Sequence, residues 1–179
     1  MRVLGISGSL RQGSHNTELL RAAAELLPPG TQLDLYEDLA DIPPYGEDVE
    51  HEPPQAVTEL KDAIAAADVV LFSTPEYNHS LPGQLKNALD WVSRPYAENP
   101  LMGKPVAVLG ASSGMFGAVW AQAELRKVAA AMGARVIDRE FPLAGAKDAF
   151  SPDGKLVDPA LQEELADLCA HLCGQLVAA

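Results

Sequence analysis

The sequence has few cysteines and few cations, and each shortage excludes a class of protein. Two cysteines, Cys169 and Cys173, are too few for a disulfide framework, which favours an intracellular, reducing location. The chain has 13 Lys and Arg residues against 25 Asp and Glu residues, which gives a formal net charge of −12. Nucleic acids and anionic membranes are bound by basic patches, so neither is an expected partner.

Long apolar runs are missing too. No stretch approaches the roughly 18 consecutive apolar residues that span a bilayer. The opening apolar run ends at Ile6 and continues into glycines and serines, unlike a signal peptide. We therefore expect a cytoplasmic protein. Its 179 residues are 47% hydrophobic and 21% charged, a globular composition that predicts a single domain over residues 1–179.

Apolar runs and helical patterns alternate along the chain. Strands are expected at residues 2–7, 31–37, 68–74, 104–110 and 134–138. Helices are expected at residues 16–27, 56–67, 82–94, 117–132 and from 158 onward. This order predicts an α/β fold, a doubly wound five-stranded parallel sheet with helices on both faces. Ligands of such sheets bind beyond the carboxyl ends of the strands.

Three loops leave those carboxyl ends with unusual chemistry, and the first is GSLRQGSHN at residues 8–16. It lacks the G-x-G-x-x-G spacing of a dinucleotide fingerprint. Gly8 and Gly13 have the first spacing of a triphosphate loop, but Ser14-His15 replaces the required Lys-Ser or Lys-Thr. A triphosphate with Mg²⁺ is therefore not expected.

The same loop can instead hold a single terminal phosphate. Its side-chain donors are one cation and three hydroxyls, from Arg11, Ser9, Ser14 and Thr17. Asn16 is the expected cap of the next helix, and a helix N-terminus with hydroxyls around it attracts anions. The alternative is an elaborate helix cap with solvated serines.

The second and third loops suit a flat ring. Residues 75–83 begin with PEYNHS and are stiffened by prolines, so an aromatic side chain and exposed N–H groups are held rigidly. Residues 110–117, GASSGMFG, combine glycines for tight turns with two serine donors. Alternatively, Tyr77 is an ordinary half-buried aromatic, Ser80 caps the next helix, and the third loop is a plain connection. Taken together, the three loops predict a phosphate at one end and a planar ring at the other, which is the shape of FMN.

The motifs GSLRQGSHN, PEYNHSLPGQLKNALDW and SSGMFG…LRKV, in this order, resemble those of the NADPH-dependent FMN reductase family. That family includes quinone, chromate and azo-dye reductases. The resemblance covers most of the chain, and its first two motifs are specific. It implies a flavodoxin-like fold, non-covalently bound FMN, NADPH or NADH as hydride donor, and a small acceptor such as a quinone, chromate, an azo compound or free flavin. It also implies assembly as dimers or tetramers.

The resemblance also implies site residues. Those expected around the phosphate and ribityl chain are Ser9, Arg11, Ser14, His15, Asn16 and Thr17. Those expected at the isoalloxazine are Pro75, Glu76, Tyr77 and Asn78, with Ser112, Ser113 and Gly114 at its other edge. Relatives often have Gly-Gly where this chain has Gly117-Ala118, so Gly117 is a less secure site residue.

No side chain is nominated as catalytic, because the flavin N5 receives the hydride and the flavin carries the chemistry. Backbone N–H groups of residues 75–78 are expected to stabilise negative charge on the reduced ring. His79 could donate a proton to a reduced quinone, but an ordinary contact at the rim is the favoured interpretation. Glu76 could similarly be a structural hydrogen-bond acceptor at the base of its loop.

Two further patterns have a structural and a functional interpretation. On the expected helix 82–94, a second face carries Gln84, Asn87, Trp91 and Arg94, which predicts a contact between subunits. The alternative is that Trp91 packs under the Pro-rich loop that follows it. Cys169, His171 and Cys173 suggest a metal, but the cysteines fall on or beside a leucine stripe, Leu161, Leu165, Leu168, Leu172 and Leu176. Small buried hydrophobes are therefore favoured, and no metal is expected.

Two other functions remain open at this point. A flavodoxin-type electron carrier would suit the acidic charge, but its phosphate loop would normally be of a Ser/Thr-Gly-Thr type rather than SLRQGSHN. A phosphate-ester hydrolase or nucleotide-binding regulator would contain no flavin and would purify colourless.

Overall fold

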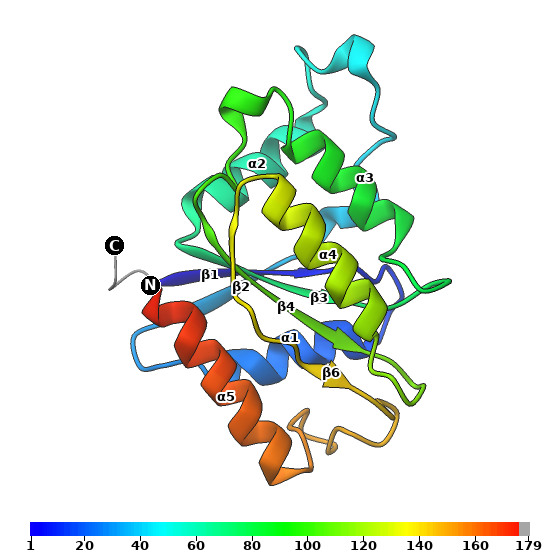
Figure 1. Cartoon of the computed structure of the whole chain (residues 1–179), viewed down its shortest axis with the longest axis vertical. Coiled ribbons are helices and arrows are strands. Elements are labelled where there is room, and N and C mark those ends of the chain that lie inside the picture. The colour runs from blue at the N-terminus through cyan, green and yellow to red at the C-terminus, as the bar shows by residue number, and fades with distance from the viewer. Residues whose placement is uncertain (176–179) are drawn as a thin grey trace.

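A parallel β-sheet forms the centre of the protein in the computed structural model, which describes residues 1–175 (Figure 1). Its strands are β1 (Arg2–Ser7), β2 (Gln32–Tyr36), β3 (Val69–Thr74), β4 (Pro105–Ala111), β5 (Arg135–Val136) and β6 (Pro142–Leu143). The strand order is β2-β1-β3-β4-β5, and every pairing is parallel. This is the flavodoxin-like order, so the predicted fold class is confirmed.

Five helices cover the sheet, and they are α1 (His15–Glu25), α2 (Gln55–Ala66), α3 (Gly83–Val92), α4 (Val119–Ala131) and α5 (Pro159–Gly174). Three short 3-10 turns accompany them, η1 (Asp38–Asp41), η2 (Glu47–Val49) and η3 (Tyr96–Glu98). One core cluster joins α1 and α5 to one face of the sheet, and another joins α2, α3 and α4 to the opposite face. Helices therefore lie on both faces, as predicted.

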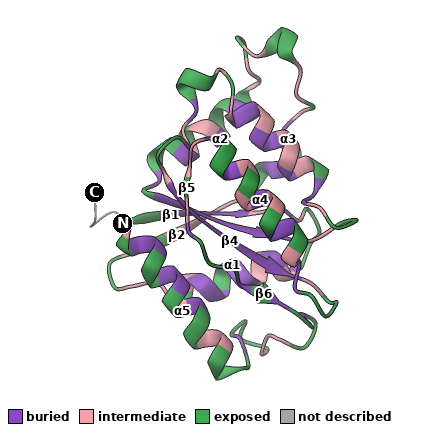
Figure 2. Cartoon of the chain, viewed as in Figure 1, coloured by how far each residue is buried: buried purple, intermediate pink, exposed green. Residues whose placement is uncertain are grey.

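Burial follows from this layering. Every residue of β3 and β4 is buried, because helices cover both faces of the central strands (Figure 2). The edge strand β2 is only partly buried, which matches its alternating pattern. The buried stripes of the amphipathic helices, such as Leu19 and Leu20 of α1, then contribute about 1.5–3 kcal/mol for each large side chain removed from water.

The last strand differs from the prediction of one strand at residues 134–138. β5 has two residues and pairs with the start of β4, at Pro105 and Val106. The chain then leaves the sheet and returns as β6, which pairs with the end of β4 at Gly110 and Ala111. Residues 137–141, IDREF, lie between the two short strands, and β6 has only two residues, too few to leave a strand pattern in the sequence.

The cysteines of α5 are small buried residues, as predicted. Cys169 and Cys173 are both buried among the leucines of the helix stripe, while His171 is exposed. Burial raises the pKa of the Cys169 thiol to about 12. No cluster of three or more metal-ligating side chains occurs within the described part of the chain. Leu176, expected on the same stripe, lies outside the described residues.

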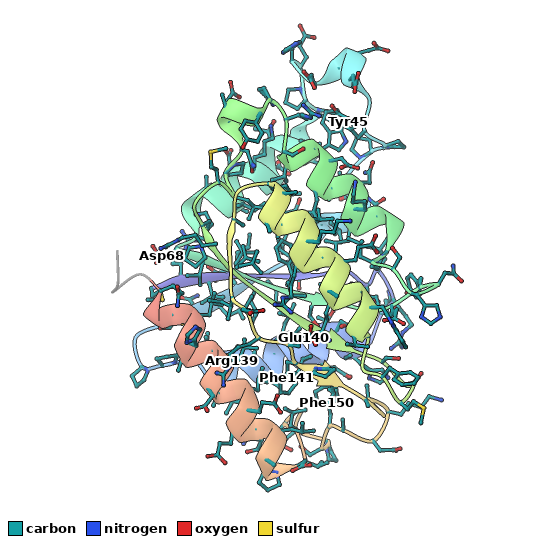
Figure 3. The ribbon with its side chains drawn as sticks, in the orientation of Figure 1. Tyr45, Asp68, Arg139, Glu140, Phe141 and Phe150 are labelled. Carbon is teal, nitrogen blue, oxygen red and sulfur yellow. The ribbon has the colours of Figure 1, made fainter. Side chains whose placement is uncertain are left out.

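The second face of α3 is covered within the chain. Trp91 is 1% exposed, and its Nε1–H donates to the Pro43 carbonyl at 2.8 Å. The Tyr45 ring, labelled in Figure 3, meets the Trp91 ring edge-on, with 5.1 Å between the ring centroids. Gln84 and Asn87 also bind the segment that contains Pro43. The reason for predicting a subunit contact through this face, an uncovered Trp91, is wrong, because the segment around Pro43 covers that side chain. A contact between subunits through α3 itself stays a prediction.

Candidate functional site

The three predicted loops meet at the carboxyl edge of the sheet. A cavity of about 190 Å³ lies between them. It is lined by Ala111 and by ten of the predicted residues, Ser9, Arg11, Ser14, His15, Asn16, Pro75, Glu76, Tyr77, Ser112 and Ser113. Loops that are far apart in the sequence converge here because they follow β1, β3 and β4, which are neighbours in the sheet. Of the other predicted residues, Asn78 and Gly114 do not line this cavity.

The first loop separates this cavity from a larger one of about 310 Å³. The two cavities share Ser9, Arg11 and Ser14 in their walls. The larger one adds Thr17 and a second cation, Arg21, which is exposed one turn further along α1. The sequence patterns gave no reason to select Arg21, because only the helix geometry brings it to the same side as Thr17.

The start of α1 has a cap different from the predicted one. Ser14, not Asn16, is the N-cap, and its hydroxyl accepts from the Asn16 N–H at 3.2 Å. The prediction placed the cap two residues too late, because Asn and Ser are about equally good caps in sequence terms. The remaining first-turn N–H groups of α1 have no acceptor within the helix, so they are available to an anion.

Asn16 instead ties α1 to the sheet. It is 3% exposed, its side-chain nitrogen donates to the Ala111 carbonyl at 3.1 Å, and its side-chain oxygen accepts from the Ala111 N–H at 3.0 Å. The same oxygen accepts from the Ser73 hydroxyl at 2.8 Å. One side chain therefore joins the beginning of α1 to the ends of β3 and β4, and so fixes the floor of the cavity.

His15 faces two neighbours at the same end of α1. Its Nδ1 lies 2.9 Å from Glu18 Oε2. Its ring is parallel to that of Phe150, with 6.3 Å between the centroids, and Phe150 is labelled beside the start of α1 in Figure 3. The residue is thus held in place by ring stacking and by a carboxylate on the next turn.

The second loop contains a tight hairpin. Tyr77 and Ser80 exchange two backbone hydrogen bonds of 3.0 and 3.1 Å, and the residues between them, Asn78 and His79, have φ values of 53° and 60°. Two central residues with positive φ are the signature of a type I′ turn. The Tyr77 N–H is used inside this turn and Pro75 has none, so neither is available to a bound ring. Of the N–H groups expected at residues 75–78, those of Glu76 and Asn78 stay a prediction.

Glu76 connects this hairpin to α4. Its Oε2 accepts from the backbone N–H groups of Trp120 and Ala121, at 3.1 and 3.2 Å. Glu76 is therefore a structural hydrogen-bond acceptor, as one of the two interpretations of the sequence predicted. That its donors belong to α4 could not be predicted from the sequence. Ser80 does not cap α3, whose N-cap is Pro82; the Ser80 hydroxyl donates to Glu124.

The third loop is shaped by two residues with positive φ. Gly117 has φ 57°, and a Cβ there would lie 2.4 Å from the Pro142 carbonyl carbon, so only glycine fits. Ala118 has φ 61° and forms the N-cap of α4 without any side-chain hydrogen bond. The Ser112 hydroxyl accepts from the Gly114 N–H at 3.0 Å and so holds the turn.

Gln122 is a structural residue that was not among those expected from the sequence. It is fully buried; its side-chain nitrogen donates to the Gly117 carbonyl and its oxygen accepts from the Phe141 N–H. Gln122 therefore ties α4 to neighbouring segments through buried hydrogen bonds, as Asn16 ties α1 to the sheet. A polar residue on the buried side of an amphipathic helix was the available signal.

The rim of the cavity is open and aromatic. Tyr77, Phe116 and Trp120 are between 42% and 56% exposed, and Met115 is 77% exposed. The rings of Phe116 and Trp120 lie 5.0 Å apart. A planar molecule could therefore enter the cleft from solvent without displacing the core.

A flavodoxin-like sheet with a phosphate-type loop after β1 and a cleft beside it defines a class of small α/β flavin-binding folds. The family model for NADPH-dependent FMN reductases matches residues 1–148 of this chain. The chain belongs to the NADPH-dependent FMN reductase family, and the predicted family is confirmed. It is an oxidoreductase that depends on FMN and NAD(P)H.

Individual relatives agree with the family. The chain is 46% identical over 165 residues to an NAD(P)H-dependent FMN reductase of Pseudomonas aeruginosa, covering 91% of this chain and 88% of that protein. It is 36% identical over 182 residues to a quinone reductase of Escherichia coli K12, covering 99% and 93%. These similarities favour the enzyme over a flavodoxin-type carrier.

Solved structures give the same result. The flavoenzyme FerB of Paracoccus denitrificans, an NAD(P)H:(acceptor) oxidoreductase, superimposes with a TM-score of 0.85 at 36% identity, over 96% of this chain and 94% of that one. A flavodoxin of Pseudomonas aeruginosa has a TM-score of 0.62 at 20% identity, over 97% and 100%, which shows the shared fold alone. No helix among residues 1–175 has the length and apolar character needed to cross a membrane.

Proposed function

We propose that the cleft between the three loops holds FMN, with the phosphate at the start of α1 and the ring between residues 75–77 and 111–113. The single observation that carries this proposal is the cavity whose walls unite all three loops. The cavity behind the first loop shares Ser9, Arg11 and Ser14 with it, so the combined space is elongated, as the cofactor is.

The residues at the phosphate end fit a dianion. Hydroxyls of Ser9 and Thr17, the Arg11 guanidinium and the first N–H groups of α1 are all donors. Arg21 adds a second positive charge in the same wall, which also contains one carboxylate, that of Glu37. The one carboxylate in the first turn, that of Glu18, lies beside His15 rather than in either cavity wall.

The residues at the ring end fit a flat, partly polar molecule. Ser112, Ser113 and the main chain of residues 75–77 present polar groups, and Pro75 and Tyr77 present apolar surface. When bound, FMN supplies the capacity to take a hydride from a nicotinamide and to deliver electrons to an acceptor. The protein binds it, orients it and leaves one side open at the rim of Tyr77 and Phe116, where both substrates can meet the ring in turn.

A quinone is the acceptor class that the comparisons favour for this chain. The support is that relatives of this chain include quinone reductases. In addition, aromatic side chains are exposed at the rim of the cleft. A planar acceptor would stack there at little cost in desolvation. We also propose a cytoplasmic location.

A homo-oligomer is proposed as well. Large apolar side chains outside the cleft are exposed, among them Tyr96 shortly after α3, at 58%, and Met102, at 47%. Light scattering tests this proposal. A dimer or tetramer is expected, and a monomer at all concentrations would reject it.

One experiment tests the function directly. The purified protein, reconstituted with FMN and freed of excess, should show a flavin absorbance spectrum that bleaches on addition of NADPH and recovers on addition of a benzoquinone. Steady NADPH consumption with the quinone is expected for the enzyme. A protein that stays colourless after reconstitution would contradict the assignment, and one that binds FMN without oxidising NADPH or NADH would be a carrier.

A further inference from the structure

Helix α4 begins without a cap of its own. Its N-cap residue is Ala118, which has no polar side chain, and the first-turn N–H groups of Trp120 and Ala121 would otherwise have no acceptor. Both donate instead to Oε2 of Glu76, which comes from the hairpin loop 44 positions before Trp120. The Glu76 side chain is only 14% exposed, although Trp120, one of its two donors, lies at the surface.

Two more contacts join the same two segments. The His79 ring meets the Trp120 ring edge-on, with 4.6 Å between centroids. The Ser80 hydroxyl donates to the Glu124 carboxylate one turn further along α4. The hairpin between residues 77 and 80 is therefore attached to the first two turns of α4 at three points.

His79 also faces the other oxygen of Glu76, with 3.5 Å between Nδ1 and Oε1. His79 occupies a position of the turn at which φ is 60° and glycine is the usual residue. Its contacts with Glu76 and Trp120 hold this conformation. Both carboxylate oxygens of Glu76 thus have partners within the protein, although the residue also forms part of the cavity wall.

We propose that Glu76 is a positioning residue. By capping α4 from the hairpin, it holds the two sides of the ring-binding cleft as one unit, and it acts on FMN through the main chain of the hairpin and through α4, not by contact of its carboxylate with the ring. This inference rests on the proposed function, since it takes the cleft of residues 75–77 and 111–113 to be the ring site.

The test compares three variants. Glu76→Ala removes the acceptor, and Glu76→Gln keeps an oxygen that can accept from Trp120 and Ala121. Asp158→Ala is the matched control, because Asp158 caps α5 in the same way, by accepting from the Ala160 N–H at 2.9 Å, on the opposite face of the sheet. Hydrogen exchange of the α4 amides is measured on ligand-free protein, FMN affinity by quenching of flavin fluorescence, and KM and kcat with a benzoquinone.

Glu76→Ala is expected to speed exchange at Trp120 and Ala121, to weaken FMN binding about tenfold and to raise KM for the quinone more than it lowers kcat. Glu76→Gln is expected to restore most of the FMN affinity. Asp158→Ala is expected to lower thermal stability to a similar degree while FMN affinity stays at the wild-type value.

Three results would overturn the inference. Equal FMN affinity in Glu76→Ala and Asp158→Ala would leave Glu76 as a cap without influence on the cleft. Loss of FMN affinity in Glu76→Gln as large as in Glu76→Ala, with α4 exchange unchanged, would mean that the carboxylate acts on the flavin itself. Failure of the wild-type protein to bind FMN would instead reject the proposed function, and this inference with it.

Discussion

Two helices start at the same edge of the sheet, α1 after β1 and α4 after β4, but their N-termini are prepared for different partners. α1 is capped by the neutral hydroxyl of its own Ser14, and cations and hydroxyls surround it. α4 is capped by the carboxylate of Glu76 from another loop. A helix N-terminus attracts one anion, and at α4 that anion is already part of the protein.

For the FMN site proposed above, the difference predicts the direction in which the cofactor binds. A phosphate dianion is stabilised at α1, where its charge meets Arg11 and unoccupied N–H groups. It would be repelled at α4 by Glu76. The ring end must therefore lie toward α4, where neutral serines and aromatic side chains line the cleft. Cations at one end, and Glu76 with neutral side chains at the other, thus distinguish the two ends of the cleft.

Each of the two helices is also attached through a buried side chain. The largest expected effect, on the free energy of unfolding, comes from removing that side chain at α1. Asn16→Ala leaves the buried N–H and carbonyl of Ala111 and the hydroxyl of Ser73 without partners. The expected loss is about 3 kcal/mol in the free energy of unfolding. Urea unfolding measures it. Gln122→Ala is the equivalent change in α4, and a loss below about 1 kcal/mol for both would show that neither side chain anchors its helix.

Making the two N-termini alike is the next test. Ser14→Asp keeps a good N-cap, since Asp and Ser cap helices equally well, but it places a carboxylate where the phosphate is proposed to bind. FMN affinity should fall by about 100-fold because two like charges then lie within a few ångströms. Fluorescence quenching measures the affinity. Asp158→Ser, the reverse exchange of caps at α5, is the control and should leave FMN binding unchanged; unaltered binding in Ser14→Asp would remove the phosphate from this helix.

A smaller effect is expected when the cation beside α1 is removed. Arg11 is exposed in a loop and makes one long hydrogen bond, to the Gln12 carbonyl at 3.4 Å, so Arg11→Ala should leave thermal stability almost unchanged. Loss of a charge-assisted hydrogen bond to the phosphate should weaken FMN binding about tenfold. Arg21→Ala, measured alongside, shows whether the second cation of the larger cavity contributes. Equal flavin content in wild type and Arg11→Ala would exclude Arg11 from the site.

The same two helix starts show what the sequence could predict. The order of apolar runs was enough for the sheet and its helices, because burial on both faces of a strand leaves a clear pattern. At α1 the donors and the cap are neighbours in the sequence, so the cap could be predicted to within two residues, and the phosphate end stays a prediction. At α4 the cap is Glu76, and only folding brings it there. The cover of Trp91 by the segment around Pro43 was missed for the same reason: both contacts join residues that are far apart in the chain.

The smallest expected effect concerns the backbone at the start of α4. Ala118 holds φ 61°, a left-handed conformation that costs a non-glycine residue about 1 kcal/mol, whereas Gly117 next to it has no room for a side chain. Ala118→Gly should therefore raise the free energy of unfolding by up to about 0.5 kcal/mol, since relief of strain is partly offset by the greater entropy of glycine in the unfolded chain. Differential scanning calorimetry measures the change, with Gly117→Ala as the opposite case, expected to be strongly destabilising. A clear loss of stability in Ala118→Gly would mean that packing of the buried Ala118 methyl group stabilises the fold by more than the left-handed backbone conformation costs. The start of α4, unlike that of α1, would then be fixed by packing as well as by its cap.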